Sequence, residues 1–249
     1  KLTLGALAMG DVWFGGRTRN PWNTEQGSSG SSAGPGSATA AGLVGFSIGS
    51  ETLGSISSPS TRNGVTGLRP TFGRVPRTGA MALSWTMDKL GPMTRSAEDA
   101  ALVLAAIHGP DGLDRTVKAA PFNWDASVRP SRLRVGYVRS AFERDYPQKA
   151  FDAATLDVLR AQGMTLTPIE LPEVEYGAMR MILTAEAAAA FDELTRSNRD
   201  AELTEQGPNA WPNTFRVARL IPAVDYINAN RLRTVAIERW AALMKTVDV

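Results

Sequence analysis

The sequence predicts an α/β fold in which a mixed β-sheet lies between helices. The pattern of residues 133–138 predicts a strand, that of residues 148–161 a helix ending near Gly163, and that of residues 164–169 a second strand. This order of strand, helix and strand is typical of α/β sheets. The chain has 249 residues, of which 43% are hydrophobic, so it is long enough to bury a core.

The other elements follow in chain order from helix propensity and capping signals. Ser96-Ala-Glu-Asp99 resembles a capping box, which predicts a helix that runs to Ile107 and stops at Gly109-Pro110. The remaining expected elements are a helical turn in residues 1–10, a helix at 37–43, strands at 44–48 and 65–68, and helices at 176–197 and about 224–244.

Composition and charge exclude several classes of function. Lys and Arg number 27 against 25 Asp and Glu, and no run of bases occurs, so we expect no direct binding of nucleic acid. The apolar runs are far shorter than the roughly 20 residues of a membrane span, so we expect none. The absence of cysteine removes thiol nucleophiles and thiolate metal sites. His108, the one histidine, ends a predicted helix, which favours a structural role.

Residues 27–60 are unusually rich in serine and glycine and allow two interpretations. A flexible linker is typical of a Gly/Ser-rich decamer such as residues 27–36. The Ala-rich and apolar residues that follow favour a densely packed segment instead, because small residues let two stretches of backbone approach each other closely. We therefore expect close packing in this segment.

A serine hydrolase without a catalytic histidine needs another general base, and Ser-Lys arrangements supply one. Burial makes the neutral form of such a lysine accessible, because desolvation disfavours the charged form. A second serine between the two can pass the proton, since a hydroxyl group both donates and accepts hydrogen bonds. The serine-bearing turns in residues 27–36 and 49–58 supply candidates for both serines.

These turns belong to a longer pattern. It consists of Ser29-Gly-Ser-Ser-Ala-Gly34, Ala40-Ala-Gly-Leu-Val-Gly-Phe-Ser-Ile-Gly49, Glu51-Thr-Leu-Gly-Ser-Ile56 and Gly64-Val-Thr-Gly-Leu-Arg-Pro-Thr71. The pattern resembles the signature block of the amidase signature family, and the match runs without gaps from Asn20 through Thr71. Further similarity follows at residues 73–76 and 88–100, and more loosely at residues 223–234.

The resemblance implies a role for each site residue. Ser55 would be the nucleophile that attacks the amide carbonyl. Ser31 would relay the proton, and the peptide bond that precedes it, between Gly30 and Ser31, would be cis. The backbone N–H groups that would form the oxyanion hole are those of Thr52, Leu53, Gly54 and Ser55. The supporting residues would be Gly30, Ser32, Glu51 and Arg62. The resemblance implies no metal and no cofactor.

Three positions depart from the family's usual motif. Leu53 replaces the first glycine of Gly-Gly-Ser, Ser57 replaces an arginine, and Glu51 replaces an aspartate. These substitutions concern substrate identity more than chemistry. Arg62 follows the nucleophile turn, where it would contact polar groups of the substrate or support the loop.

The catalytic lysine of the family lies well upstream of the Ser-Ser pair. Only thirty residues precede Ser31, and Lys1 is the one lysine among them. Lys1 matches a lysine of a later motif, and Lys89 and Lys118 lie in other contexts, so none is assigned the role. We therefore expect a central piece of a longer amidase, truncated at both ends, whose lysine lies outside this chain.

The expected function is an amidohydrolase that cleaves carboxamide C–N bonds of small-molecule amides through a serine acyl-enzyme. One alternative is the glutaminase A subunit of a tRNA-dependent amidotransferase, and another is a non-catalytic protein that retains the fold. We expect one partial domain, 1–249, with a signature core at about 20–110 and a more variable region at 111–249. The sequence does not determine the location, for which it favours the cytoplasm only weakly, and a homodimer is a candidate assembly.

Overall fold

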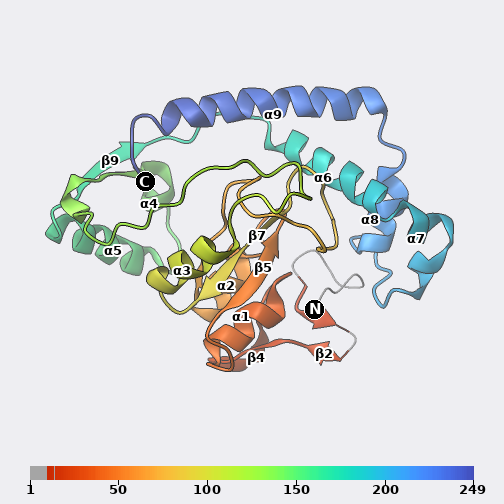
Figure 1. The fold of residues 1–249 in the computed structure, drawn as a ribbon, viewed down its shortest axis with the longest axis horizontal. Coiled ribbons are helices and arrows are strands. Elements are labelled where there is room, and N and C mark those ends of the chain that lie inside the picture. The colour runs from red at the N-terminus through yellow and green to blue at the C-terminus, as the bar shows by residue number, and fades with distance from the viewer. Residues whose placement is uncertain (1–9, 14) are drawn as a thin grey trace. The chain divides into compact units, whose positions relative to one another are not determined.

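The computed structural model describes residues 10–13 and 15–249 and divides them into two compact units (Figure 1). The first unit contains the residues through Asn123 together with Met181–Ala223, and the second contains Trp124–Arg180 and Val224–Val249. The helical turn expected in residues 1–10 lies, apart from Gly10, outside the described residues. In the described part of the chain, no helix is long and apolar enough to cross a membrane.

The first unit begins with two small antiparallel hairpins. Strands β1 (Val12–Trp13) and β2 (Gly16–Arg17) form one, and β3 (Arg19–Asn20) and β4 (Asn23–Gly27) form the other. The second hairpin is joined to the residues that follow the Gly/Ser-rich tract, because Asn20 Nδ2 donates to the carbonyl oxygen of Arg62 at 3.0 Å. The Gly/Ser-rich tract therefore starts from an anchored strand.

A three-stranded antiparallel sheet lies at the centre of the first unit. Its order is β5 (Ser47–Glu51), β7 (Lys89–Thr94) and β6 (Thr66–Gly67). The register places Gly49 opposite Gly91 and Glu51 opposite Lys89. Because the side chains of directly opposite residues lie on one face of an antiparallel pair, Glu51 and Lys89 share a face.

Helices α1 (Ala33–Ala40), α2 (Ser57–Asn63) and α3 (Ala97–Ile107) pack against these strands, and Figure 1 shows α1 and α2 beside β5. The predicted start of α3 is confirmed, because the Ser96 side chain accepts a hydrogen bond from the N–H of Asp99 at 3.0 Å. A side chain at the N-cap satisfies an N–H group that has no partner within the helix.

The Gly/Ser-rich tract is a packed segment and not a linker. A Cβ atom on Gly49 would lie 2.9 Å from side-chain atoms of Ile56, Met93 and Ser32, which is closer than packing allows. Buried Gly36 is similarly close to Asn63, Met93 and Pro59. The glycines are therefore required because β5, α1 and α2 approach one another so closely.

The later part of the first unit, Met181–Ala223, is largely helical. It contains the part of α6 (Tyr176–Ala190) that starts at Met181, then α7 (Asp192–Arg196), a 3₁₀ turn (Arg199–Glu202) and α8 (Trp211–Ala218). Its core is a cluster of Ala187, Phe191 and Phe215, in which the two phenylalanine rings stack with their centroids 4.8 Å apart. Such aromatic pairs bury much apolar area and fix the mutual orientation of the helices.

The second unit contains the predicted strand–helix–strand element. Strands β8 (Arg134–Val138) and β9 (Thr165–Ile169) pair in parallel, and α5 (Lys149–Ala161) connects them. The other helical elements are a 3₁₀ turn (Pro130–Arg132), α4 (Arg139–Glu143) and α9 (Ala223–Leu243). An ion pair of 2.8 Å between Arg134 and Asp248 joins the end of the chain to β8.

The predicted fold class is confirmed, while some boundaries differ. The strands form several small sheets, antiparallel at β5-β7-β6 and parallel at β8-β9. Helix α1 starts at Ala33 and not at Ser37, because a proline is tolerated in the first helical turn. Strand β5 covers Ser47–Glu51 and not 44–48, since its pairing with β7 and the close fit of Gly49 outweigh local propensity.

Candidate active site

The two turns that carry Ser31 and Ser55 lie against each other. The N–H of Ser32 donates to the carbonyl oxygen of Ser55 at 3.1 Å. The Ser32 hydroxyl also donates to the Ser50 carbonyl oxygen at 3.1 Å and accepts from the Ser50 N–H at 3.0 Å. Ser32, one of the expected supporting residues, thus joins the start of α1 both to β5 and to the turn of Ser55.

The peptide bond between Gly30 and Ser31 is cis, as the resemblance implies. Ser31 and Ser55 are both half-buried. Within the described residues, no direct hydrogen bond joins their two hydroxyl groups. The two turns are therefore joined through Ser32 and by a hydrogen bond of 2.7 Å between the hydroxyl groups of Ser29 and Ser58.

The turn before Ser55 explains how Leu53 is accommodated. Gly54 has a φ of +91°, in the region that favours glycine, whereas Leu53 is not among the residues with a positive φ. The Leu53 side chain is exposed and meets no steric restriction there. A Cβ is therefore tolerated at position 53, whereas the positive φ at position 54 makes any side chain strained there.

The carboxylate of Glu51 stabilises this turn by accepting hydrogen bonds. Its Oε2 atom accepts hydrogen bonds from the N–H of Ile56 (2.8 Å), from the N–H of Ser57 (2.9 Å) and from the Ser57 hydroxyl (2.8 Å). Its Oε1 atom lies 3.4 Å from the Arg69 guanidinium. Burial raises the pKa of Glu51, but the hydrogen bonds from Ser57, Ile56 and Gly54 outweigh it and lower the pKa overall.

Two departures from the family motif, Glu51 and Ser57, are in direct contact with each other. Ser57 stands where an arginine is usual, and its hydroxyl is one of the groups that bind the carboxylate of Glu51, itself in place of an aspartate. The extra methylene of glutamate lets one oxygen reach the first N–H groups of α2 from β5. Positions 51 and 57 therefore fit each other.

The turn of Ser31 is held by close backbone contact and by Asn63. A Cβ on buried Gly30 would lie 2.1 Å from the carbonyl oxygen of Gly10, so only glycine fits. The fully buried amide of Asn63 donates to the carbonyl oxygens of Ser28 (2.9 Å) and Pro59 (2.7 Å), which joins the Ser/Gly tract to α2. Arg62 is exposed and donates to the Gln26 side chain at 3.3 Å, on the strand that precedes the tract.

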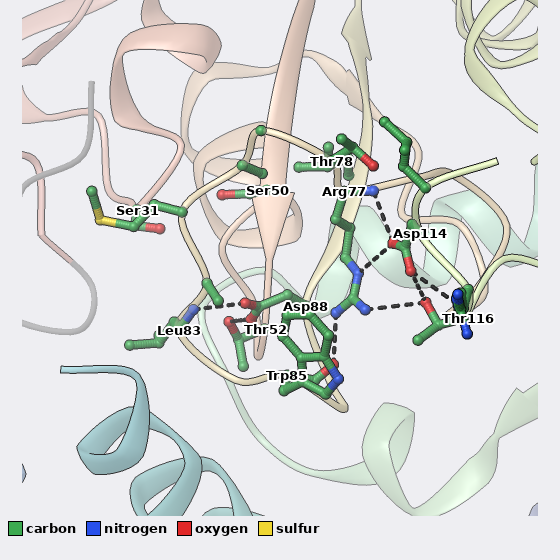
Figure 2. A pocket seen from close by; sticks show the side chains of 17 residues that line it. Ser31, Ser50, Thr52, Arg77, Thr78, Leu83, Trp85, Asp88, Asp114 and Thr116 are labelled. Atoms are coloured by element: carbon green, nitrogen blue, oxygen red, sulfur yellow. Dashed lines mark hydrogen bonds and ion pairs between the residues drawn. The ribbon is translucent and has the colours of Figure 1, made fainter. Parts of the chain in front are cut away.

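A cavity of about 570 Å³ opens beside Ser31 (Figure 2). Ser31, Ser50 and Thr52 contribute to its wall, and the loop of residues 77–85 and residues 113–116 form much of the rest. Its size and its largely apolar wall with a few polar groups are typical of small-molecule sites. The candidate proton-relay serine thus faces a pocket that can hold a substrate, whereas Ser55 is not among the described residues that line it.

A buried ion pair closes one side of this pocket. Arg77 Nε lies 3.2 Å from Asp114 Oδ2, and only 11% of the Arg77 side chain and 8% of the Asp114 side chain are exposed. Although burial raises the pKa of Asp114, hydrogen bonds from Thr116 and Arg77 hold it well below its ordinary value. Asp114 is therefore ionised at neutral pH and forms an ion pair with the Arg77 guanidinium.

Asp88 connects the pocket wall to the turn of Ser55. It accepts hydrogen bonds from the N–H group of Leu83 (2.8 Å) and from the hydroxyl of Thr52 (Figure 2). It also accepts one from the N–H group of Ser84 at 3.0 Å. From α6, the buried carboxylate of Glu186 accepts from the Ser84 hydroxyl at 2.5 Å. The loop is thus fixed from two sides by carboxylates.

Lys89 lies on the other face of β7 from the pocket residues Asp88 and Leu90. Its Nζ donates to the carbonyl oxygen of Thr52 at 3.2 Å. Burial first, and then the nearby Arg69, lower its pKa to about 8, while Glu51 and Asp88 act in the opposite direction. Lys118 is exposed, and Lys1 lies outside the described residues.

We expect Lys89→Met to raise the free energy of unfolding at pH 7 by about 1 kcal/mol, after allowance for partial exposure. The folded pKa of about 8 lies below the ordinary 10.5, so the unfolded chain binds more protons between these values. Wild-type stability should therefore rise as pH increases through this window, and that rise should disappear in the variant. Urea unfolding at pH 7, 8.5 and 10 measures both effects. A folded variant without activity would show that the reaction depends on Lys89, either as the general base or through its hydrogen bond to Thr52.

His108 has the structural position that was predicted for it. It caps the carboxyl end of α3, where its N–H donates to the Leu104 carbonyl oxygen at 3.0 Å. Its ring packs edge-on against Phe122 with the centroids 5.8 Å apart. No described lining residue of the cavity is a histidine, and the described part of the chain contains no cluster of three or more side chains that could hold a metal ion.

Arg77, Asp88, Asp114 and Glu186 were missed as site residues by sequence reasoning. Arg77 and Asp114 are 37 positions apart, and Ser84 and Glu186 are 102 apart. A local sequence pattern does not predict contacts between residues so far apart in the sequence. A signal existed only for Asp88, which begins the segment at 88–100 that resembles the family.

The architecture places the chain in a structural class. An X-ray structure of the native peptide amidase from Stenotrophomonas maltophilia is similar, with a TM-score of 0.70 and 33% sequence identity over 86% of this chain and 49% of that chain. The fold is therefore the amidase signature fold.

The family follows from the sequence matches. The family model described as Amidase matches residues 6–249, and the chain belongs to the amidase family. It is 40% identical to the A subunit of the glutamyl-tRNA(Gln) amidotransferase from Deinococcus radiodurans, over 68% of this chain and 36% of that protein. It is 38% identical to the subunit of the same name from Roseiflexus sp. (strain RS-1), over 94% of this chain and 53% of that protein. The chain thus spans about half the length of such relatives, or less.

Proposed function

We propose that the protein containing this chain is an amidohydrolase that cleaves carboxamide C–N bonds through a serine acyl-enzyme. The observation that carries the proposal is the joining of the two serine turns by Ser32, whose N–H binds the carbonyl oxygen of Ser55. Turns that far apart in sequence would not meet in this way if they were linkers. Membership of the amidase family gives the arrangement its chemical meaning.

In the proposed reaction, the hydroxyl oxygen of Ser55 attacks the amide carbonyl carbon and its proton passes to Ser31, while Ser31 passes its own proton to the general base. The tetrahedral intermediate then collapses, the C–N bond breaks, and ammonia or an amine leaves with a proton. Water attacks the resulting ester, which releases the carboxylic acid and restores Ser55. The hydroxyl of Ser31 suits the relay because it donates and accepts a proton at the same time.

The proposed oxyanion hole is the turn of Thr52, Leu53, Gly54 and Ser55. Within the described residues, the N–H groups of Leu53 and Ser55 donate to no other group, which leaves them for a carbonyl oxygen. The N–H of Gly54 already contributes to the lowered pKa of Glu51, so we assign it the smaller share. Glu51, bound to the next two N–H groups, keeps the turn preorganised.

The general base of the proposed mechanism is a lysine outside this chain. Lys89 points away from the face of β7 that lines the cavity, and its Nζ is engaged with Thr52. The remaining described lysines are Lys118, which is exposed, and Lys149 and Lys245 of the second unit.

A second candidate is the glutaminase subunit of a tRNA-dependent amidotransferase, in which the chain would act with partner subunits. It is favoured by the names of the relatives that are 38–40% identical. Ser57 and Leu53 weaken it, because the corresponding motif usually reads Gly-Gly-Ser-Ile-Arg. A non-catalytic protein that retains the fold is a third candidate, and a homodimer stays a prediction.

The assay that separates these candidates is ammonia release by the full-length protein that contains this chain. We expect hydrolysis of simple carboxamides without any partner. A glutaminase subunit would be silent on glutamine alone and active in its complex. Absence of ammonia release from either substrate class under both conditions would support the non-catalytic protein and contradict the proposal.

A further inference from the structure

We propose that the cavity beside Ser31 binds the acyl part of the substrate and selects an apolar, uncharged acyl group. This inference rests on the proposed amide hydrolysis, because the cavity contains Ser31 and adjoins the turn of Ser55. It concerns the substrate class, which neither the fold nor the serine turns determine.

Three of the four charged side chains among the described lining residues, Arg77, Asp88 and Asp114, already have partners. Arg77 is surrounded by its ion pair with Asp114, a hydrogen bond of 3.1 Å from Nη2 to the Thr116 hydroxyl, and one of 2.7 Å from Nη1 to the Trp85 carbonyl oxygen. Its guanidinium also lies 4.8 Å from the centroid of the Phe72 ring. An Arg held in this way does not offer a donor pair to a substrate carboxylate.

The acidic groups are occupied as well. Asp88 accepts from two backbone N–H groups and from the Thr52 hydroxyl, and Asp114 accepts from Arg77 and Thr116. A substrate ammonium group would therefore have to displace existing bonds. Arg115 is the remaining charged residue among the described lining residues, and it is exposed.

Apolar groups form the rest of the wall. Met81, Leu83 and Trp85 come from the loop of residues 77–85, Leu90 from β7 and Leu113 from the segment that bears Asp114. Figure 2 shows Ser31 and Ser50 on one side of the pocket and the Arg77–Asp114–Thr116 cluster on another. The acyl chain of a substrate bound at the turn of Ser55 would pass Ser31 into the pocket and contact these apolar side chains.

The wall is rigidly attached, which makes selection by shape effective. Asp88 holds the N–H groups of Leu83 and Ser84, and Glu186 accepts from the N–H of Thr86 at 2.9 Å and from its hydroxyl at 2.8 Å. Binding an apolar chain here requires little ordering of the loop. The favourable free energy of burying apolar area is therefore not offset by a loss of loop entropy.

The test measures binding separately from catalysis. Calorimetry on the Ser55→Ala variant of the full-length protein should show that straight-chain amides bind more tightly from acetamide to hexanamide, by up to about fourfold per buried methylene. The same six-carbon amide with a terminal carboxylate, adipic acid monoamide, should bind at least tenfold more weakly than hexanamide. Competition of the amides against phosphonate labelling of the wild-type protein gives the same ranking without the variant.

Two variants and a matched control locate the effect. Met81→Gln and Leu113→Gln should reduce the preference for hexanamide over acetamide several-fold. Leu102→Gln should keep it, because Leu102 lies on α3 outside the cavity and is as exposed as Met81, at 61% against 59%. Circular dichroism verifies that each variant is folded.

Three results would overturn the inference: equal affinity for all chain lengths, tighter binding of the carboxylated amide with its loss in Arg115→Gln, or an equal effect of the control variant. Failure of the proposed function has a different signature. In that case serine-directed phosphonates would not label the wild-type protein, whatever the ranking of the amides by calorimetry.

Discussion

Replacement of Ser55 by alanine should abolish amide hydrolysis by the full-length protein, with a loss of about 10⁴-fold or more. Without the Oγ atom no acyl-enzyme forms, and water must attack the amide unaided. Labelling by a serine-directed phosphonate should disappear with it, because the same oxygen attacks phosphorus. Initial rates of ammonia release and mass spectrometry of the labelled protein measure the two effects.

Ser31→Ala is the informative companion of this variant. Hydrolysis should fall strongly because the proton loses its relay, yet Ser55 and its turn remain anchored to Ser32, so slow labelling should persist. The control is His108→Ala, which should change turnover little because the imidazole packs against Phe122 at the end of α3.

The reverse pattern would refute the mechanism. If activity survived Ser55→Ala and disappeared with His108→Ala, both the assignment of the nucleophile and the proposed reaction would be wrong. Full activity of the isolated chain of 249 residues would contradict the location of the general base outside it.

Elements whose signals are local were predicted well. The cap at Ser96 and the strand–helix–strand element of the second unit depend on side chains a few positions apart, and both are present. The start of β5 was misplaced because its residues, Ser47–Glu51, have poor strand propensity and are paired only because β7 lies beside them. Pairing between segments about forty residues apart leaves no periodic trace in a single sequence.

In the candidate site too, the features with local sequence signals were predicted and those that depend on long-range contacts were not. The motif located the turns of Ser31 and Ser55, and the structure shows why Leu53 is tolerated, since positive φ falls on Gly54. The pocket could not be predicted, because Arg77 and Asp114 find each other only in the folded chain. Whether Ser31 and Ser55 act as proposed stays a prediction.

Glu51→Ala should destabilise the protein by about 3 kcal/mol, the largest effect on stability that we expect from a residue outside the reacting groups. The substitution leaves the buried N–H of Ile56, the N–H of Ser57 and the Arg69 guanidinium without their acceptor. Urea unfolding at pH 7 measures the loss.

Two milder variants show which property of Glu51 is responsible for the loss of stability. Glu51→Gln keeps an acceptor but removes the charge, so the loss should be smaller. Glu51→Asp restores the residue usual in the family, yet it should cost about 1–2 kcal/mol here, because the shorter side chain no longer reaches both N–H groups and the hydroxyl of Ser57.

The pH dependence separates the charge of Glu51 from its packing. The folded pKa is lowered from the ordinary 4.5, so the contribution of the carboxylate is complete above about pH 4.5 and is lost as pH falls through the folded value. The wild-type protein should therefore lose its advantage over Glu51→Gln on acidification, and the two unfolding curves should converge at low pH. A constant difference from pH 7 down to pH 3 would mean that packing, and not the charge on Glu51, holds the turn of Ser55. A wild-type stability equal to that of Glu51→Ala at pH 7 would remove Glu51 from the support of the proposed oxyanion hole altogether.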